Sequence, residues 1–229
     1  MATPIRVISS MATRQLLADL DAPFARYSAQ PVQVETVGGV VAARRVREGE
    51  AFDAVVLTST AIDELIGAGR AVAGSRVDLV RSGVAVAVRS GAAEPAIGDE
   101  AAVKAAVLAA RSLGYSTGPS GVYLAALFER WGIADQIKDR IVQAPAGVPV
   151  GSLVAEGRVE LGFQQLSELM GLAGITVLGP LPSAIQIMTT FSAGLCSASA
   201  QPAAVRQWFD VITSAEVAQI KRDNGMQPV

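Results

Sequence analysis

The residues best suited to hold a ligand are short runs rich in serine, threonine and glycine that recur along the chain. The sequence has no histidine and one cysteine, Cys196, which argues against a zinc site, a haem site, a Ser–His–Asp or Cys–His nucleophile and an intrachain disulfide. Acid–base chemistry would have to use Asp, Glu, Tyr or one of three lysines. Backbone N–H groups and hydroxyls at helix N-termini instead attract anions. We therefore expect a small anionic ligand, with no metal and no cofactor.

These runs stand where six predicted strands end. In open parallel α/β sheets, ligands lie beyond the carboxyl ends of the strands. The runs cover residues 9–13, 38–40 and 58–60 in the first part of the chain, and residues 116–122, 146–147 and 164–165 in the second. Each run alone is also an ordinary helix cap or turn. Their recurrence at strand ends in both parts is what favours a ligand site.

The predicted ligand-binding residues come from these runs and from one arginine. Arg81 stands where the chain crosses between two predicted lobes, where its guanidinium could clamp a carboxylate or could simply be exposed. Strand alternation points Gln164 and Gln165 to opposite sides, so at most one faces the ligand and a backbone-capping role is the alternative. The full candidate set is Ser10, Met11, Gly39, Val40, Arg81, Ser116, Ser120, Gly121, Val122 and Gln165.

The elements that position these residues alternate between strand and helix. Buried apolar runs predict strands at 5–9, 32–37, 53–58, 83–88, 114–116, 141–142, 159–163, 175–178 and 185–195. Helical spacing of apolar residues predicts helices at 13–27, 40–47, 61–68, 100–111, 150–156 and 203–221, and another that carries Leu124, Leu127, Phe128 and Trp131. This alternation predicts an α/β fold with mostly parallel sheets. We expect one lobe at residues 1–82 plus 192–229 and the other at 83–191.

Bulk properties limit the partners. Of the 229 residues 51% are hydrophobic, which supports a real core, and the net charge of −2 gives no reason to expect nucleic acid. No apolar run reaches the length of about 20 residues that spans a bilayer, so membrane insertion is not expected. The N-terminal residues lack the pattern of a signal peptide. We expect a cytoplasmic location for the chain as written, or a periplasmic one if it is a trimmed mature form.

The order of several motifs resembles a known family. The segments IRVISS at 5–10, GG at 38–39, EGEAFDAV at 48–55, PSGVY at 119–123 and VAEGRVELG at 154–162 resemble the molybdate-binding, substrate-binding proteins of ABC transporters over nearly the whole chain. The resemblance implies a two-lobed type 2 periplasmic-binding-protein fold with two hinge crossings, an ABC permease as partner and an oxyanion held by loop N–H and hydroxyl groups. By position, it implies ligand contacts near Ser10 to Ala12, at Gly39, at Ser120, near Gly147 and at Gln165.

The same resemblance contains departures that bear on the ligand. Gly38-Gly39-Val40 replaces an expected serine-rich loop, and Gln165 replaces an expected tyrosine, so hydroxyl donors are lost on both sides. This argues against molybdate or tungstate. The segments LVRSGVAVAVR at 79–89, GFQQLSE at 162–168 and GPLP at 179–182 resemble a subgroup that is usually labelled molybdate-binding and includes aconitate isomerase. An organic carboxylate fits Arg81 and the amides better.

Three functions follow from these features. The leading hypothesis is a substrate-binding protein that clamps a small anion, most consistent with an organic carboxylate, between two lobes. The second is an aconitate-isomerase-like enzyme that moves a double bond in an unsaturated tricarboxylate, for which a base is needed. Tyr115, Tyr123 and Glu168 lie nearest the loops, and none is a convincing base from sequence, so the catalytic residues stay unassigned. The third is a sensor that closes on its ligand.

Overall fold

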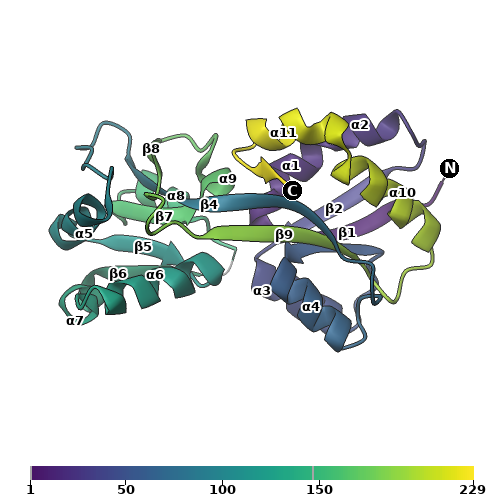
Figure 1. Ribbon diagram of the computed structural model, residues 1–229, viewed down its shortest axis with the longest axis horizontal. Coiled ribbons are helices and arrows are strands. Elements are labelled where there is room, and N and C mark those ends of the chain that lie inside the picture. Colours follow the sequence, from purple (N-terminus) through teal and green to yellow (C-terminus); the bar gives the residue numbers. More distant parts are fainter. Residues whose placement is uncertain (1, 146) are drawn as a thin grey trace. The chain divides into compact units, whose positions relative to one another are not determined.

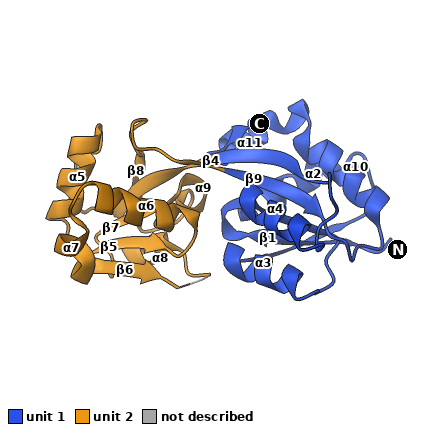
Figure 2. Ribbon diagram, turned by 60° about the horizontal axis from the view of Figure 1, so that its bottom comes forward, with its two compact units in different colours: residues 1–81, 190–229 blue, residues 82–189 orange. Residues whose placement is uncertain are grey.

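The computed structural model describes residues 2–145 and 147–229. Ala146 of the predicted 146–147 loop lies outside the described residues. The chain divides into two compact units, unit 1 of Met1–Arg81 with Thr190–Val229 and unit 2 of Ser82–Thr189 (Figure 2). The boundaries predicted from the sequence fall one residue later at the first crossing and two residues later at the second. Among the described residues, no helix is both long and apolar enough to cross a membrane.

Unit 1 is built on a sheet whose three neighbouring strands run parallel. Strand β1 (Ile5–Ser10) pairs in parallel with β2 (Val32–Val37) on one side and with β3 (Ala54–Thr58) on the other. Strand β9 (Met188–Leu195) pairs antiparallel with β3. The last strand, β10 (Gln227–Pro228), pairs antiparallel with the unit 1 end of β4 (Val77–Arg89). The carboxyl ends of β1, β2 and β3 therefore share one edge of this sheet.

Helices cover both faces of the unit 1 sheet, as Figure 1 shows. Alternate residues of β3 face opposite ways, so Ala54 and Val56 enter one core and Val55 and Leu57 the other. The first core is closed by α1 (Arg14–Asp19), α2 (Asp21–Ala25), α10 (Pro202–Thr213) and the segment of α11 (Ala218–Asp223). The second is closed by α3 (Gly39–Arg47) and α4 (Ser59–Gly67). Burial on both faces explains why β3 is a continuous apolar run.

Unit 2 repeats this design. Strand β5 (Leu113–Ser116) pairs in parallel with β6 (Ile141–Ala144) and β7 (Leu161–Gln165), whereas β4 pairs antiparallel with β7 and with β8 (Ile175–Pro180). The main core packs α5 (Glu100–Ala109), α6 (Pro119–Arg130) and α7 (Ala134–Ile137) on one face. Helices α8 (Val150–Ala155) and α9 (Leu166–Leu169) pack on the other. Short 3-10 turns occur at Met11–Thr13, Lys138–Arg140 and Ala215–Val217.

The predicted α/β fold is confirmed, and the element boundaries differ in instructive places. The predicted helix at 13–27 is broken into a turn, α1 and α2, because Pro23 has no N–H for the carbonyl of Asp19. The predicted helix at 203–221 breaks near Ser214, which has extended backbone. The strand predicted at 159–163 begins at Leu161 because the Glu160 N–H donates to Ser112 Oγ at 2.9 Å. Strand β7 ends at Gln165 and therefore contains both glutamines.

The single cysteine lies in unit 1, next to the end of β9. Its side chain is buried, as the apolar run around it predicts. Burial, together with the nearby carboxylate of Asp53, raises the pKa of the Cys196 thiol to about 12. Cys196 is therefore a protonated core thiol and takes no part in the ligand loops.

Candidate ligand-binding site

The unit 1 part of the candidate site lies where β1, β2 and β3 end. Ser10 ends β1, Gly39 begins α3 after β2, and Thr58 caps α4 by accepting a hydrogen bond from the Ala61 N–H at 3.4 Å. A Cβ added to Gly39 would lie 3.6 Å from Ser10 Cβ, in ordinary van der Waals contact. The structure thus brings Ser10 and Gly39 together, beside helix N-termini that favour negative charge.

The hydroxyl of Ser10 differs from its neighbours. Ser9 Oγ and Thr13 Oγ1 lie 2.6 Å apart and satisfy each other inside the turn. Ser10 is 6% exposed, and its Oγ has no hydrogen-bond partner among the described residues. Leaving a buried hydroxyl unpaired costs about 1–3 kcal/mol, which a ligand atom would recover. Ser10 Oγ is therefore available to hydrogen-bond a ligand, at a residue that the sequence predicts to be a ligand contact.

Two apolar side chains accompany these polar groups. Met11 is half-buried in the turn after β1. Val40, the second residue of α3, is 63% exposed. With Ser10 and Gly39, they supply backbone donors, a buried unpartnered hydroxyl and hydrocarbon, and these four residues have no ionisable side chain.

The unit 2 part begins at the turn between β5 and α6. Ser116 Oγ accepts a hydrogen bond from the Gly118 N–H at 3.3 Å, and Ser120 is buried in the first turn of α6. A Cβ on Gly121 would stand 1.7 Å from the Ser116 carbonyl oxygen. Glycine is thus required there by the close packing of helix against strand. Val122, the next residue, is 68% exposed.

The two glutamines of β7 have different surroundings, in keeping with their opposite orientation. Gln164 Oε1 accepts from the Gly151 N–H at 3.2 Å, and its Nε2 donates to Glu168 Oε2 at 2.6 Å, so Gln164 caps α8. Gln165 is 4% exposed, and its Nε2 donates to Thr189 Oγ1 at 2.9 Å. Gln165 Oε1 has no partner among the described residues. Gln165 is therefore the member of the pair that has a group left for a ligand.

Glu168 is the acidic side chain of the loops that end the unit 2 strands. Burial raises the pKa of its carboxyl to about 7, and the hydrogen bond from Gln164 opposes that rise. A carboxyl with such a pKa can exchange a proton near neutral pH. It shares the Gln164 side of β7, against the beginning of α8.

The other residues considered as bases are held in structural contacts. Tyr115 is buried against Phe128, with ring centroids 6.2 Å apart, and burial raises the pKa of its hydroxyl. Tyr123 donates its hydroxyl to the Ile185 carbonyl at 2.5 Å. Neither arrangement presents a base to a ligand. Among the described residues, no three His, Cys, Asp or Glu side chains gather as a metal site would require.

Arg81 and Gly147, which the sequence also predicts to be ligand contacts, are both exposed. Arg81 is exposed in β4, where its backbone is opposite Gln227 of β10. Gly147 is exposed, with a φ of 84° that favours glycine.

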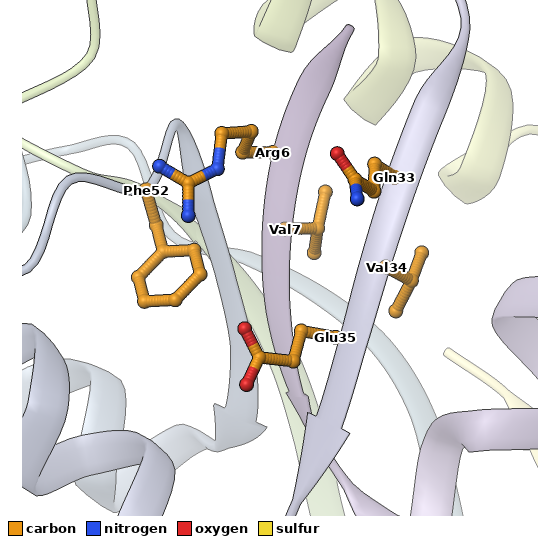
Figure 3. Close-up of a pocket in the computed structure, with 6 residues that line it drawn as sticks. All are labelled: Arg6, Val7, Gln33, Val34, Glu35 and Phe52. Atoms are coloured by element: carbon orange, nitrogen blue, oxygen red, sulfur yellow. The ribbon is translucent and has the colours of Figure 1, made fainter.

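A pocket of about 290 Å³ lies elsewhere in unit 1, over the first halves of β1 and β2. Figure 3 shows Arg6, Gln33, Glu35 and Phe52 around it. The ring of Phe52 lies between two guanidiniums, 5.1 Å from Arg6 Cζ and 5.3 Å from Arg45 Cζ. Arg45 also pairs with Glu35, and this contact lowers the pKa of the Glu35 carboxyl. The charged side chains around this pocket largely pair with one another, and the pocket lies away from the carboxyl ends of the strands.

Sequence reasoning missed two buried hydroxyls. Ser82 Oγ and Ser167 Oγ have no hydrogen-bond partner among the described residues. Ser167 lies in α9, just after β7, and the burial of its hydroxyl depends on how that short helix packs, which leaves no local signal in the sequence. Ser82 follows Arg81, whose charge drew attention to the crossing, and strand alternation could have indicated that its neighbour points inward.

Comparisons with known proteins give a consistent result. Residues 5–227 match the family model described as bacterial extracellular solute-binding protein. An aconitate isomerase of Pseudomonas sp. is 39% identical over 186 residues, which cover 81% of this chain and 71% of that protein. The periplasmic molybdate-binding protein of Azotobacter vinelandii is 19% identical, with a TM-score of 0.80 and coverage of 97% and 98%. The binding protein AgtB of A. tumefaciens R10, in complex with agropinic acid, is 14% identical, with a TM-score of 0.73 and coverage of 100% and 83%.

Proposed function

The chain belongs to the family of bacterial extracellular solute-binding proteins, and we propose that it binds a small organic carboxylate and delivers it to an ABC permease. The observation that carries this proposal is the buried, unpartnered hydroxyl of Ser10 together with the buried Gln165 amide, which has one end without a partner. Because a carboxylate only accepts, the Gln165 amide would present its NH₂ group to the ligand while Oε1 accepts from Thr189 Oγ1. Ser10 and Gln165 each stand at the carboxyl end of a strand, one in unit 1 and one in unit 2. We propose that each of these groups binds ligand at the strand ends of its own unit, and that the protein works in the periplasm.

The composition of the loops favours a carboxylate over a compact metal oxyanion. An oxyanion surrounded by oxygens needs donors on every side, whereas an organic acid has a hydrocarbon part that can lie on apolar side chains. Val40 and Val122 supply such surfaces, each close to the polar groups of its own unit. The similarity to an aconitate isomerase, at 39% identity, supports an organic acid. The likeness to the agropinic-acid-binding protein, at 14% identity, supports the fold, as does the likeness to the molybdate-binding protein.

The test of this function is a thermal-shift screen. The probes are trans-aconitate, citrate, tricarballylate, molybdate, tungstate and sulfate. A probe present at 100 times its Kd should add about 2.7 kcal/mol to the free energy of unfolding, which is easily measured as a shift of Tm. We expect the tricarboxylates to stabilise the protein. Stabilisation by molybdate or tungstate alone would show that the carboxylate assignment is wrong.

A second proposal concerns Arg81 as a clamp for one carboxylate of the ligand. Its side chain is exposed, and its position at the end of unit 1 is compatible with bidentate binding. Arg81→Ala should weaken tricarboxylate binding about tenfold or more. Arg89→Ala, at the exposed far end of the same strand, is the matched control. Equal affinities for both variants and the wild type would remove Arg81 from the site.

Two observations favour an isomerase as the second candidate function. The aconitate isomerase relative covers most of the chain, and Glu168 has a carboxyl pKa of about 7. In this reaction, a base takes a proton from a carbon beside a carboxylate, and the proton returns at the other end of the allylic unit as the double bond moves. Glu168 would carry the proton, and the substrate of an isomerase would then lie on the Gln164 side of β7. The bonds broken and formed are both C–H bonds, so no oxidant or cofactor is needed.

Exchange of carbon-bound hydrogen separates the two functions. Incubation of trans-aconitate with the protein in deuterated buffer, followed by NMR, should show deuterium on carbon if the protein is an isomerase. Glu168→Gln should then abolish exchange while it keeps binding. Binding without exchange would reject the isomerase and leave the solute-binding function in place.

A further inference from the structure

A second polar cluster lies on the crossing strands of unit 2, and it includes a residue outside the predicted set. Ser82, the first residue of unit 2, is fully buried in β4. Its Oγ has no hydrogen-bond partner among the residues that the structure describes. A buried hydroxyl without a partner is unfavourable in the free protein. A ligand that hydrogen-bonds to Ser82 Oγ would explain why a hydroxyl occupies this apolar strand.

The register of the sheet relates Ser82 to Gln165. Val84 of β4 stands directly opposite Gln165 of β7 in an antiparallel pair, and opposite residues direct their side chains to the same face. Ser82 precedes Val84 by two positions and therefore shares that face. Arg81 points to the other face, in agreement with its exposure. A carboxylate held by Arg81 would therefore not reach Ser82, and the Arg81→Ala and Ser82→Ala variants distinguish the two faces. The two unpartnered groups, Ser82 Oγ and Gln165 Oε1, thus belong to one face of unit 2.

Thr189 completes the cluster. Its Oγ1 lies 2.9 Å from Gln165 Nε2, and it is the last residue of unit 2, on the second crossing strand, β9. A hydroxyl can donate or accept, so Thr189 can hold either end of the Gln165 amide and leave the other end for a ligand. With Thr189 donating to Oε1, the amide presents its NH₂ group to an acceptor.

We propose that Ser82 is a ligand-binding residue and that Thr189 is a positioning residue that orients Gln165. The ligand group is a carboxylate, whose two oxygens accept from Ser82 Oγ–H and from the Gln165 amide. This inference rests on the proposed carboxylate-binding function and assigns two further residues to its site.

The first experiment measures Ser82→Ala by calorimetric titration with trans-aconitate and citrate and by thermal unfolding. Without ligand, Tm should rise by about 2–4 °C, because an unpaired buried hydroxyl is removed. Affinity for the probe that binds should fall at least about tenfold, because hydrogen bonds to charged groups are strong. Ser90→Ala, just beyond the same strand and exposed, should match the wild type in both measurements.

The second experiment separates a positioning role from a packing role. Thr189→Val keeps the shape and removes the hydroxyl, whereas Thr189→Ser keeps the hydroxyl. The valine variant should lose about tenfold in affinity, and the serine variant should bind within about threefold of the wild type. Thr190→Val, the neighbouring half-buried threonine, is the control and should bind as the wild type does.

The outcomes keep this inference distinct from the proposed function. If the wild type binds neither tricarboxylate, the proposed function fails. If the wild type binds and Ser82→Ala binds equally well, Ser82 holds only a buried water and its assignment is overturned. If Thr189→Val binds as well as the wild type, or Thr189→Ser binds as weakly as Thr189→Val, the positioning role is overturned.

Discussion

The two units end their parallel strands in the same topology with different chemistry. In unit 1, Ser10 and Gly39 offer a hydroxyl and backbone groups, and the adjoining loops contain no ionisable side chain. In unit 2, Gln165 and Glu168 add an amide and a carboxyl with a pKa of about 7. The strand-end loops of unit 1 thus have only uncharged groups that suit any small anion. Apart from the role proposed for Arg81, we expect selectivity among anions, and any transfer of a proton, to come from unit 2.

Glycine has a different role in each unit, and this gives the largest expected effect. Gly121→Ala would place a Cβ 1.7 Å from the Ser116 carbonyl oxygen, so α6 would have to shift. We expect a loss of at least about 3 kcal/mol and a fall in Tm on the order of 10 °C, measured by thermal unfolding. Gly39→Ala meets only ordinary contacts at 3.6 and 3.8 Å and should retain wild-type stability within about 1 kcal/mol.

The reverse result for this pair would contradict the comparison. If Gly39→Ala unfolded the protein and Gly121→Ala did not, tight packing against a glycine would be a property of the Gly39 turn in unit 1 and not of the Gly121 turn in unit 2. With stability retained, Gly39→Ala should weaken ligand binding, because its methyl group lies beside Ser10.

The carboxyl of Glu168 should make stability depend on pH. Its pKa in the folded protein is about 7, above the ordinary value of 4.5, so the folded state holds a proton that the unfolded state releases. The contribution is fully present below about pH 4.5 and is lost as pH rises through 7. Glu168→Gln should therefore be more stable than the wild type at pH 8, by up to about 3 kcal/mol, in urea unfolding.

The control for this pH effect is Glu129→Gln, an exposed glutamate of unit 2. It should retain the decline in stability between pH 5 and pH 8 that the wild type shows. If Glu168→Gln declines as steeply as the wild type, the contrast between an ionisable unit 2 site and a neutral unit 1 site does not hold.

Ser10 and Gln165 test the comparison at the level of binding. Ser10→Ala should weaken trans-aconitate, citrate and tricarballylate by similar factors of about ten, because a neutral hydroxyl donor is common to all anions. Gln165→Ala should weaken them unequally, because an amide with one end held by Thr189 has a fixed direction. Titration calorimetry measures both. Equal losses for Gln165→Ala across the probes would place selectivity elsewhere.

The smallest effects are expected at the two exposed valines. Val40→Ser and Val122→Ser should change the free energy of unfolding by less than about 0.5 kcal/mol, because both side chains are on the surface of their units. Each should lower affinity for tricarballylate a few-fold by removing an apolar contact. Leu108→Ser, an exposed apolar residue of α5, is the control. A few-fold gain in affinity would show that the ligand presents a polar face there.

Local patterns predict much of this fold and only part of its site. Apolar strands followed by serine indicated where Ser10 would lie, and an apolar strand followed by two amides indicated Gln165. The pairing of Gln164 with the Gly151 N–H, 13 positions away, depends on how α8 packs against β7 and leaves no local signal. The pKa of Glu168 likewise depends on burial by distant residues. Ser82 was overlooked because its burial follows from β4 being longer than its most apolar stretch, 83–88.

The buried state of Cys196 has a practical consequence for measuring ligand binding. Its thiol is protonated and shielded, so it should react slowly with maleimides at neutral pH. A cysteine introduced at Val40 or Val122 would then be the thiol that takes a fluorescent dye. A fluorescent sensor for the ligand could therefore be made from this chain without first replacing Cys196.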